Sequence, residues 1–477
     1  MSRMSRQHPD TSARQLSLKR LELENFRCFG NAVVEFHPEL TVLVAENAQG
    51  KSAVLAAASL ALGPIVSELC GVTPQPLTSD AVRIAFASDE HMQPCLPMRL
   101  KAVGEVRGVE LEWSRTRASV SAHAGASRKD LKTAIAEARE LRLLAQADGA
   151  CLLPVAAFYR TDRLWSSMGG ESRRIRPDRR IQGRWLGYAD WTSPTSSFSA
   201  FVAWYRGAFT QLGSATSKFN DSGSRLEKQI VAVHEAVRTA LQPTGWTNIN
   251  WERSGDSTTP MMGGDFISIE HPSRGRLPLQ FLSDGIQNMV ALVADLAYRC
   301  VVLNPHLGEA APRETSGVVL IDEIDMHLHP RWQQVVVELI RKAFPKIQFV
   351  VTTHSPQVLS TVDKESIRLI RLDSAATSVT QPRYQTRGIE SADILARLMD
   401  VDPVPQVEEA KWLSEYRALL QLAKQQSPEG TQLWEKIVSH FGADNPVLSE
   451  IEVLRRFQEF RVTHGLTDGG NAEDAEA

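Results

Sequence analysis

Eight residues near the start of the chain, 45–52 (AENAQGKS), are of types that bind phosphate. They fit the pattern GxxxxGK[ST] except that Ala45 replaces the first glycine. Backbone N–H groups around Gly50 would cradle phosphates, Lys51 would place positive charge on the β- and γ-phosphates, and the Ser52 hydroxyl would ligate Mg²⁺. A chance Gly-Lys-Ser at a helix start is the alternative. The expected binding residues are Ala45, Glu46, Asn47, Ala48, Gln49, Gly50, Lys51 and Ser52.

Two adjacent acids follow an unbroken apolar run at residues 318–323 (VVLIDE). Such a run is typical of a strand buried on both faces, and ligands bind beyond the carboxyl ends of such strands. We expect Asp322 to bind Mg²⁺, directly or through water, and Glu323 to orient and polarise the attacking water. An ordinary strand with a polar turn gives the same pattern, so this assignment depends on the other motifs.

Two further segments offer groups that could contact phosphate. The run IQFVVTTHSP, which begins at Ile347, predicts another buried strand, and His354 follows it where a γ-phosphate sensor would be needed. Ser283 and Gly285, within LSDGIQ at 282–287, precede a helical run and supply a hydroxyl, a flexible backbone and a helix N-terminus. A structural histidine and a plain N-cap at Ser283 are the alternatives.

The elements that must position these residues are visible in the hydrophobic pattern. Residues 17–44 alternate as three short strands, and the last of them leads into the phosphate-binding loop. After Lys51 the Ala- and Leu-rich segment SAVLAAASLALG predicts a helix that stops at Gly63-Pro64. The region from about 65 to 265 mixes alternating and helical segments without a sustained heptad repeat, which predicts a compact inserted lobe.

Composition narrows the class of protein. The chain has 477 residues, 43% of them hydrophobic, and a formal net charge of -3, so contact with nucleic acid would need a local basic patch. We expect a cytoplasmic protein with no membrane contact, because no apolar run approaches the length of a bilayer span and the start is polar. Five scattered cysteines without a CxxC pair predict neither a disulfide framework nor a zinc site.

The order of the four motifs resembles the ABC-type ATPase heads of the SMC, RecF and OLD families, which belong to the AAA-type ATPases: phosphate loop, LSxG-type signature, DE strand and histidine switch. The segment LELENFRCFGNAVVEF at 21–36 looks like their opening strands, and Asp325 falls where their D-loop lies. The resemblance implies ATP and Mg²⁺ as cofactors. It also implies catalytic roles for Lys51, Glu323 and His354, and a dimer in which Ser283 and Gly285 face the nucleotide of the second subunit.

Secondary matches resemble the short-insert group typified by the PtuA ATPase of Septu anti-phage systems, which also accompanies some retrons. They are FYRTDRLW at 158–165, RWLGYADW at 184–191, Phe201, Trp204 and DEIDMHLHPRWQ. This resemblance implies a homodimer or higher homo-oligomer and a separate HNH nuclease (PtuB-like) as partner, with a reverse transcriptase and its msDNA where a retron is attached. Two features depart from the pattern: Ala45 and Ala48 replace glycines, and the usual Q-loop glutamine has no counterpart that we can assign.

The expected fold is an α/β, ABC-type P-loop head formed by residues 16–62 and 265–375, with an inserted α+β and helical lobe at 63–264. A disordered tail at 1–15, a helical partner-binding region at 376–466 and an acidic tail at 467–477 complete the chain. No built-in nuclease is expected, because RLIRLDSAA after residue 365 contains no DxD.

The leading hypothesis is an ATPase subunit of a defence complex whose nucleotide state controls an HNH nuclease. The alternatives are a RecF-like DNA-binding repair ATPase and a nucleotide-binding scaffold with little turnover. The arginine-rich stretch SRRIRPDRRIQGR at 172–184, with tryptophans nearby, could bind nucleic acid. A solvated surface loop explains the same composition.

Overall fold

The computed structural model describes residues 14–86, 92–120, 128–161, 181–192, 194–213, 221–253, 265–372, 377–402, 404–422, 424–442 and 444–463. The chain divides into two compact units, Met1–Ile394 and Leu395–Ala477. Residues 1–13 of the tail expected at 1–15 lie outside the described residues, as does the tail expected at 467–477. So do residues 162–165 of FYRTDRLW and most of the arginine-rich stretch.

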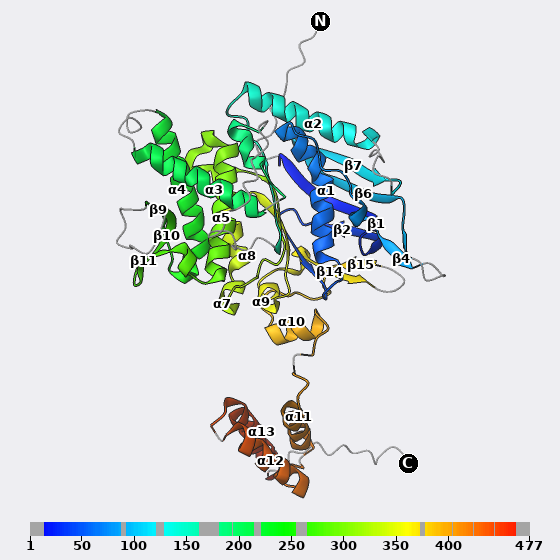
Figure 1. Ribbon diagram of the computed structural model, residues 1–477. Coiled ribbons are helices and arrows are strands. Elements are labelled where there is room, and N and C mark those ends of the chain that lie inside the picture. Colours follow the sequence, from blue (N-terminus) through cyan, green and yellow to red (C-terminus); the bar gives the residue numbers. More distant parts are fainter. Residues whose placement is uncertain are drawn as a thin grey trace, which may run out of the picture. The chain divides into compact units, whose positions relative to one another are not determined.

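A six-stranded sheet forms the centre of the first unit, in the order β15-β14-β3-β13-β12-β8 (Figure 1). All neighbours are parallel except β15, which pairs antiparallel with β14. The inner strands are short runs of aliphatic residues buried on both faces, as expected for a covered parallel sheet. The strands are β3 (Leu40–Val44), β8 (Val155–Tyr159), β12 (Gly317–Ile321), β13 (Ile347–Thr352), β14 (Ile367–Leu372) and β15 (Thr377–Thr380).

An antiparallel sheet, in the order β2-β1-β6-β7, completes the head. Its strands are β1 (Leu16–Phe26), β2 (Phe29–Glu35), β6 (Met98–Val106) and β7 (Val109–Arg117). The expectation that residues 63–264 form a separate lobe is therefore wrong. Strands β6 and β7 extend the sheet begun by β1, and β8 is an edge strand of the central sheet beside β12. Strand pairing between distant segments, which local patterns do not encode, assigns these strands to the head.

Helix α1 (Lys51–Cys70) lies between the two sheets and contacts strands of both. It continues through Gly63 and Pro64, so the predicted stop at that pair is wrong. A proline removes the N–H that would bond the carbonyl of Leu60. Arg115 on β7 replaces it, since its Nη1 donates to that carbonyl at 2.6 Å. Trp113 Nε1 donates to the next carbonyl, that of Ala61, at 2.9 Å.

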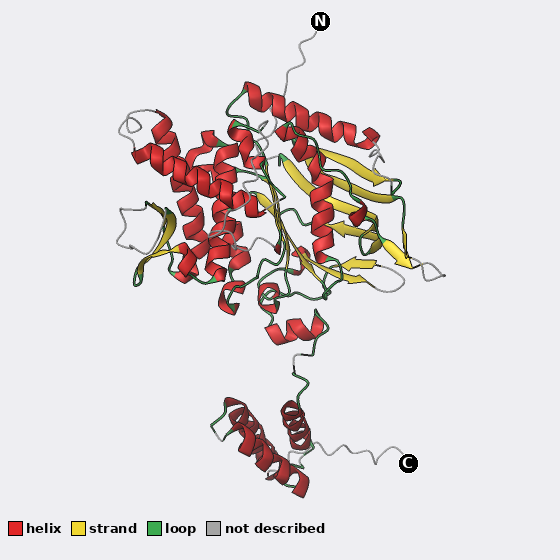
Figure 2. Cartoon of the chain, viewed as in Figure 1, coloured by secondary structure: helices red, strands yellow, loops and turns green. Residues whose placement is uncertain are grey.

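Helices cover the other face of the central sheet, and Figure 2 shows them gathered on that side. The long ones are α3 (Pro194–Gly213), α4 (Asp221–Leu241) and α5 (Asp284–Leu303), with the shorter α8 (Val336–Ala343) beside α4. Helix α5 packs on β8, on α4 and on the 3₁₀ helix η3 (Gly183–Tyr188). Helix α2 (Arg128–Ala147) packs on α1 and β7, and therefore belongs to the antiparallel side.

Smaller elements connect these layers. A three-stranded sheet has the order β11-β10-β9, and β4 pairs with β5. Their bounds are β4 (Ile84–Phe86), β5 (Met92–Pro94), β9 (Ile249–Glu252), β10 (Phe266–His271) and β11 (Gly275–Pro278). The short helices are η1 (Ser79–Ala81), η5 (Gln242–Thr244), η6 (Leu279–Phe281), η7 (Pro305–Ala310), α6 (Ala311–Glu314), α7 (Pro330–Gln333), α9 (Pro356–Leu359), η8 (Lys364–Ser366) and α10 (Ser391–Arg397).

Two core helices, α1 and α5, are long and apolar enough to meet a length-and-composition test for membrane spans. The expectation that no such segment exists is therefore wrong. In each helix 83% of the tested window is buried inside the protein. Their apolar character is explained by burial in the core, because a helix that is hydrophobic on all sides is typical of a covered position.

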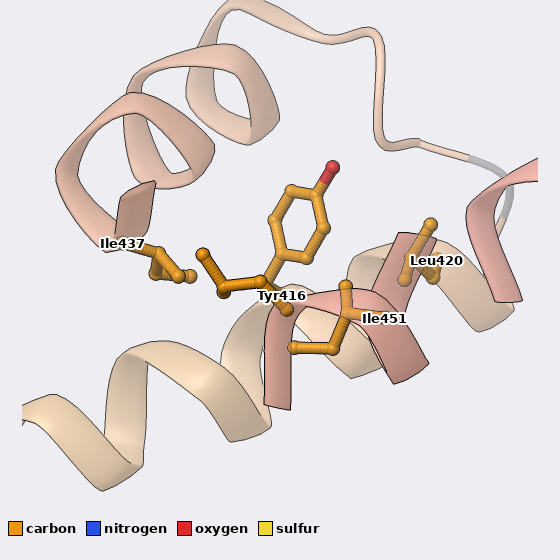
Figure 3. Packing of buried hydrophobic residues seen from close by; sticks show 5 residues of the cluster. Tyr416, Leu420, Ile437 and Ile451 are labelled. Carbon is orange, nitrogen blue, oxygen red and sulfur yellow. The ribbon is translucent and has the colours of Figure 1, made fainter. Parts of the chain in front are cut away.

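The described residues of the second unit form three complete helices, α11 (Glu408–Gln421), α12 (Pro428–Phe441) and α13 (Pro446–Thr463). Tyr416, Leu420, Ile437, Leu448 and Ile451 form its core, with rings and aliphatic chains meeting between the helices (Figure 3). The predicted helical C-terminal region is thus present, but its boundary at 376 is wrong. Strand β15 pairs with β14, so residues 377–380 belong to the central sheet.

Candidate functional site

The carboxyl ends of three parallel strands bring the predicted site residues together. Strands β3, β13 and β12 are neighbours, with Leu43 paired to Thr352 and Val351 paired to Ile321. The phosphate-binding loop, His354 and the two acids follow these strands directly, so they emerge at one edge of the sheet. This is the position where open α/β sheets bind ligands.

The phosphate-binding loop uses left-handed backbone at two positions, Ala48 (φ 62) and Gly50 (φ 93). Ala45 does not have a positive φ, so alanine is compatible with that position. At Gly50 a side chain would also lack space, because a Cβ there would lie 2.4 Å from Cζ of Phe29 and 2.7 Å from Sγ of Cys28. The turn between β1 and β2 therefore supports the loop, a contact that the sequence did not indicate.

Lys51 is the first residue of α1 and is 7% exposed. Its Nζ donates to the carbonyl of Ala45 at 2.7 Å and to that of Glu46 at 3.0 Å, so the ammonium lies inside the loop. Burial lowers the pKa of Lys51, while the charges of Asp322, Glu323 and Asp325 oppose that shift. These interactions show that the loop and the acids after β12 are close enough to act on one another.

Two threonines that the sequence analysis did not single out hold the acids. The Thr352 hydroxyl donates to Oδ1 of Asp322 at 2.6 Å and accepts from the backbone N–H of Glu323 at 2.7 Å. The Thr353 hydroxyl donates to Oδ1 of Asp325 at 2.6 Å. Glu323 itself has a left-handed φ of 48, a strained conformation of the kind that clusters at functional sites. The available signal was the pair of threonines directly before His354.

His354 is half-buried next to these charges. Burial and the positive charge of Lys51 lower its pKa, and the charges of Glu323, Asp325 and Asp322 act in the opposite direction. The imidazole is therefore neutral at pH 7 and has both a donor and an acceptor nitrogen. The following Ser355 caps α9 and donates to Oε1 of Gln333 at 2.8 Å, which fixes the backbone after the histidine.

Helix α5 begins after Ser283, and its second residue, Gly285, lies beside the segment that follows β12. Ser283 is the N-cap residue, and its side chain makes no capping hydrogen bond within the described chain. A Cβ at Gly285 would lie 2.4 Å from the carbonyl oxygen of His327. Packing alone therefore requires glycine here. The expected contact of both residues with a nucleotide on a second subunit stays a prediction.

A buried polar network fixes α5 to the edge strand β8. The Tyr159 hydroxyl donates to Oδ2 of Asp295 at 2.6 Å, and Arg299 Nε donates to the same oxygen at 2.9 Å. Arg299 also donates to the carbonyls of Gly187 and Ala189, within the RWLGYADW segment. Burial raises the pKa of the Tyr159 hydroxyl, and the charge of Asp295 adds to this shift, so the phenol stays protonated as the donor.

The same network borders the site, because the backbone N–H of Asp322 bonds the carbonyl of Tyr159 at 2.8 Å. Arg160 and Thr161 follow Tyr159 at this edge, next to the acids. Neither is the glutamine expected of a Q-loop. Sequence patterns did not place these residues, since the pairing of β8 with β12 was not foreseen.

Comparison with known proteins bears on the family to which the first unit is similar. Residues 20–180 match a family model described as "AAA domain", and residues 150–360 match one described as "AAA domain, putative AbiEii toxin, Type IV TA system". "Retron Ec83 probable ATPase" from Escherichia coli is 39% identical over 181 residues, which are 37% of this chain and 32% of that protein. "Septu protein PtuA" from Bacillus mycoides (strain KBAB4) is 39% identical over 118 residues, 24% of this chain and 16% of that protein.

Among solved structures, the Smc head bound to the C-terminal winged-helix domain of ScpA aligns with 76% of this chain and 97% of its own, at 17% identity and a TM-score of 0.45. The matched segments span about a third or less of the two curated relatives. Residues 20–360 of this chain thus match two AAA-domain family models, and retron ATPases and Septu PtuA are homologues over part of the chain.

Proposed function

We propose that the chain binds ATP with Mg²⁺ at the carboxyl edge of the central sheet and hydrolyses it. The observation that carries the proposal is the meeting of Lys51, Asp322, Glu323 and His354 at the ends of three adjacent parallel strands. A lysine inside a phosphate-type loop supplies charge, and two acids with a neutral imidazole supply what phosphoryl transfer to water needs.

Each residue has a separate role in this proposal. The N–H groups at the start of α1 and the Lys51 ammonium would hold the phosphates. The hydroxyl of Ser52 and the carboxylate of Asp322 form an all-oxygen donor set, which suits Mg²⁺. Glu323 would orient the attacking water, and His354 would contact the γ-phosphate through a neutral ring nitrogen. Asp325 lies two residues after Glu323 in the same loop, and its carboxylate accepts a hydrogen bond from the Thr353 hydroxyl.

The site would be completed by a second copy of the chain. Ser283 is exposed at the N-terminus of the 20-residue helix α5 and makes no capping bond within the described chain, so its hydroxyl and the first N–H groups are free to hold phosphate. Lys51→Ala and Ser283→Arg should each abolish turnover, while mixed dimers should regain one intact site. Mixed dimers that native mass spectrometry detects, yet that hydrolyse no ATP, would refute the composite site.

The relatives suggest the setting. One is named as a retron ATPase and another as a Septu protein, so we propose a cytoplasmic ATPase subunit of an anti-phage complex. Its nucleotide state would control an associated HNH-type nuclease, with a reverse transcriptase and msDNA as further partners where a retron is attached. Co-purification with such a nuclease, followed by plasmid cleavage with and without ATP, tests this. Cleavage that ignored ATP would refute the regulatory role.

Two substitutions test the site directly. Lys51→Ala should weaken ATP binding, whereas Glu323→Gln should retain binding while hydrolysis falls by about 10²–10⁴-fold, the usual contribution of a general base. Lys342→Ala and Glu338→Gln, at exposed positions of α8, are matched controls that should hydrolyse ATP at the wild-type rate. A Glu323→Gln protein with wild-type turnover would remove the catalytic assignment.

A further inference from the structure

Helix α5 carries a buried amide without a partner close to the site. Asn288 is 6% exposed, and neither its Nδ2 nor its Oδ1 has a hydrogen-bond partner among the described residues. Buried polar groups in native proteins are almost always paired, and an unpaired one costs free energy because it has lost its water. The conformation described here therefore leaves this amide in an unfavourable state.

Asn288 lies on the face of α5 that contacts the segment following β12. Gly285 and Asn288 are three residues apart on α5, so they share one face of the helix. At Gly285 that face touches the backbone of His327. Long helical side chains lean toward the helix N-terminus, which directs the Asn288 amide toward this same contact.

The neighbouring loop, residues 322–329, is itself in a strained arrangement. Glu323 and His327 both have left-handed φ values, 48 and 61, that residues with a side chain rarely adopt. Backbone hydrogen bonds between residues three apart hold this shape. They run from the Met326 N–H to the carbonyl of Glu323 and from the Leu328 N–H to that of Asp325, each at 3.0 Å. One rearrangement of the loop could release its backbone strain and give the unpaired amide a hydrogen-bond partner.

The helix is the fixed partner in this pair. Asp295 and Arg299 lie further along the same face of α5 and bond Tyr159 and the backbone near η3. These buried contacts anchor the helix to β8. A change in the distance between Asn288 and the loop must therefore come from movement of the loop.

We propose that Asn288 is a positioning residue that holds loop 322–329 in a second, nucleotide-closed arrangement, with its Nδ2 donating to the carbonyl of His327. The inference rests on the proposed function, because Glu323, the residue assigned to orient water, lies on this loop. Closing the loop onto Asn288 would release the strain and set the carboxylate of Glu323 for reaction. Asn288 touches no reacting atom and acts through the loop.

The test compares two buried asparagines. Asn304 is fully buried, and its amide is paired: Nδ2 donates to the carbonyl of Leu153 at 2.9 Å and to the Thr315 hydroxyl at 3.0 Å, and Oδ1 accepts from the Leu153 N–H at 2.8 Å. Without nucleotide, Asn304→Leu should lower the unfolding midpoint of the full chain. Asn288→Leu should leave it unchanged or raise it, since it removes an unpaired group.

The nucleotide-dependent readout is hydrogen exchange of peptides that cover 322–329, with and without AMP-PNP and Mg²⁺. We expect slower exchange in the wild type on binding. In Asn288→Leu we expect loss of this protection, and turnover at saturating ATP reduced at least 10-fold. Wild-type protection and turnover in Asn288→Leu, or destabilisation as large as that of Asn304→Leu, would overturn the inference. A wild-type chain that does not bind AMP-PNP would instead refute the proposed function, and with it the closure.

Discussion

The buried pair Asp295–Arg299 should be among the most sensitive points of the first unit. Both side chains are nearly inaccessible, at 1% and 3% exposure, and Arg299 Nε lies 2.9 Å from Oδ2 of Asp295. Asp295→Ala leaves the guanidinium buried with the carbonyls of Gly187 and Ala189 as its remaining partners among the described residues, and removes the acceptor of the Tyr159 hydroxyl. Breaking a buried pair in this way costs about 3–5 kcal/mol.

Arg299→Met should lower the free energy of unfolding by a similar amount, because it leaves the Asp295 carboxylate buried without its cation. The double variant Asp295→Ala/Arg299→Met leaves no buried charge, so its loss should be smaller than the sum of the single losses by about 2 kcal/mol or more. Glu235→Ala, which breaks the exposed Arg238–Glu235 pair with 58% and 42% exposure, should cost less than about 0.5 kcal/mol.

The assay must report on the first unit alone, because the second unit has its own core and its own tryptophans, Trp412 and Trp434. Urea titration that is monitored by hydrogen exchange of peptides from α5 and β8 meets this requirement. A loss below about 1 kcal/mol for Asp295→Ala, or single losses that simply add in the double variant, would refute the reasoning that the charges depend on each other.

Three further predictions concern single elements. Burial lowers the pKa of His234 from 6.5 to about 4, so between these pH values the folded state binds fewer protons than the unfolded state. The contribution to stability is complete above pH 6.5 and falls by roughly 3 kcal/mol as the pH falls toward 4. His234→Gln should remove this part of the pH dependence in unfolding measurements. Ala48→Gly should raise the unfolding free energy by up to about 1 kcal/mol because it relieves a left-handed alanine, whereas Ala45→Gly, where φ is not positive, should lower it in the same thermal denaturation experiment. Arg115→Met should cost about 1–3 kcal/mol in urea unfolding by leaving a helix carbonyl unpaired, and Pro64→Ala should recover part of that loss only in this background, since alanine restores the missing N–H.

The parts of the site that the sequence predicted are those with a strong local pattern. The apolar run that ends in Asp322 and Glu323 forms a strand buried on both faces, and parallel pairing places its carboxyl end beside that of β13. The loop before α1 likewise follows its strand, as the phosphate pattern predicted. In each case the proposed site residues lie within a few positions of the pattern that identifies the strand.

The errors have a shared physical cause, which is support from distant segments. Gly63-Pro64 is a sound local stop signal, and it fails because Arg115 supplies the missing donor. The regions containing β6, β7 and β8 look like an insertion until they pair with β1 and β12. No residue pattern near these three strands identifies their partners, so the head boundaries could not be drawn from one sequence.

The bond between Arg115 and the Leu60 carbonyl sets an order for folding. The two residues are 55 positions apart, so the second half of α1 is not complete until β7 has formed and docked. A helix is ordinarily a local structure that can form early, and long-range contacts form late because a long loop must close first. During synthesis the start of α1, with its phosphate-binding loop, would leave the ribosome well before the segment that finishes the same helix. The proposed nucleotide site and the antiparallel sheet should therefore mature as one cooperative unit.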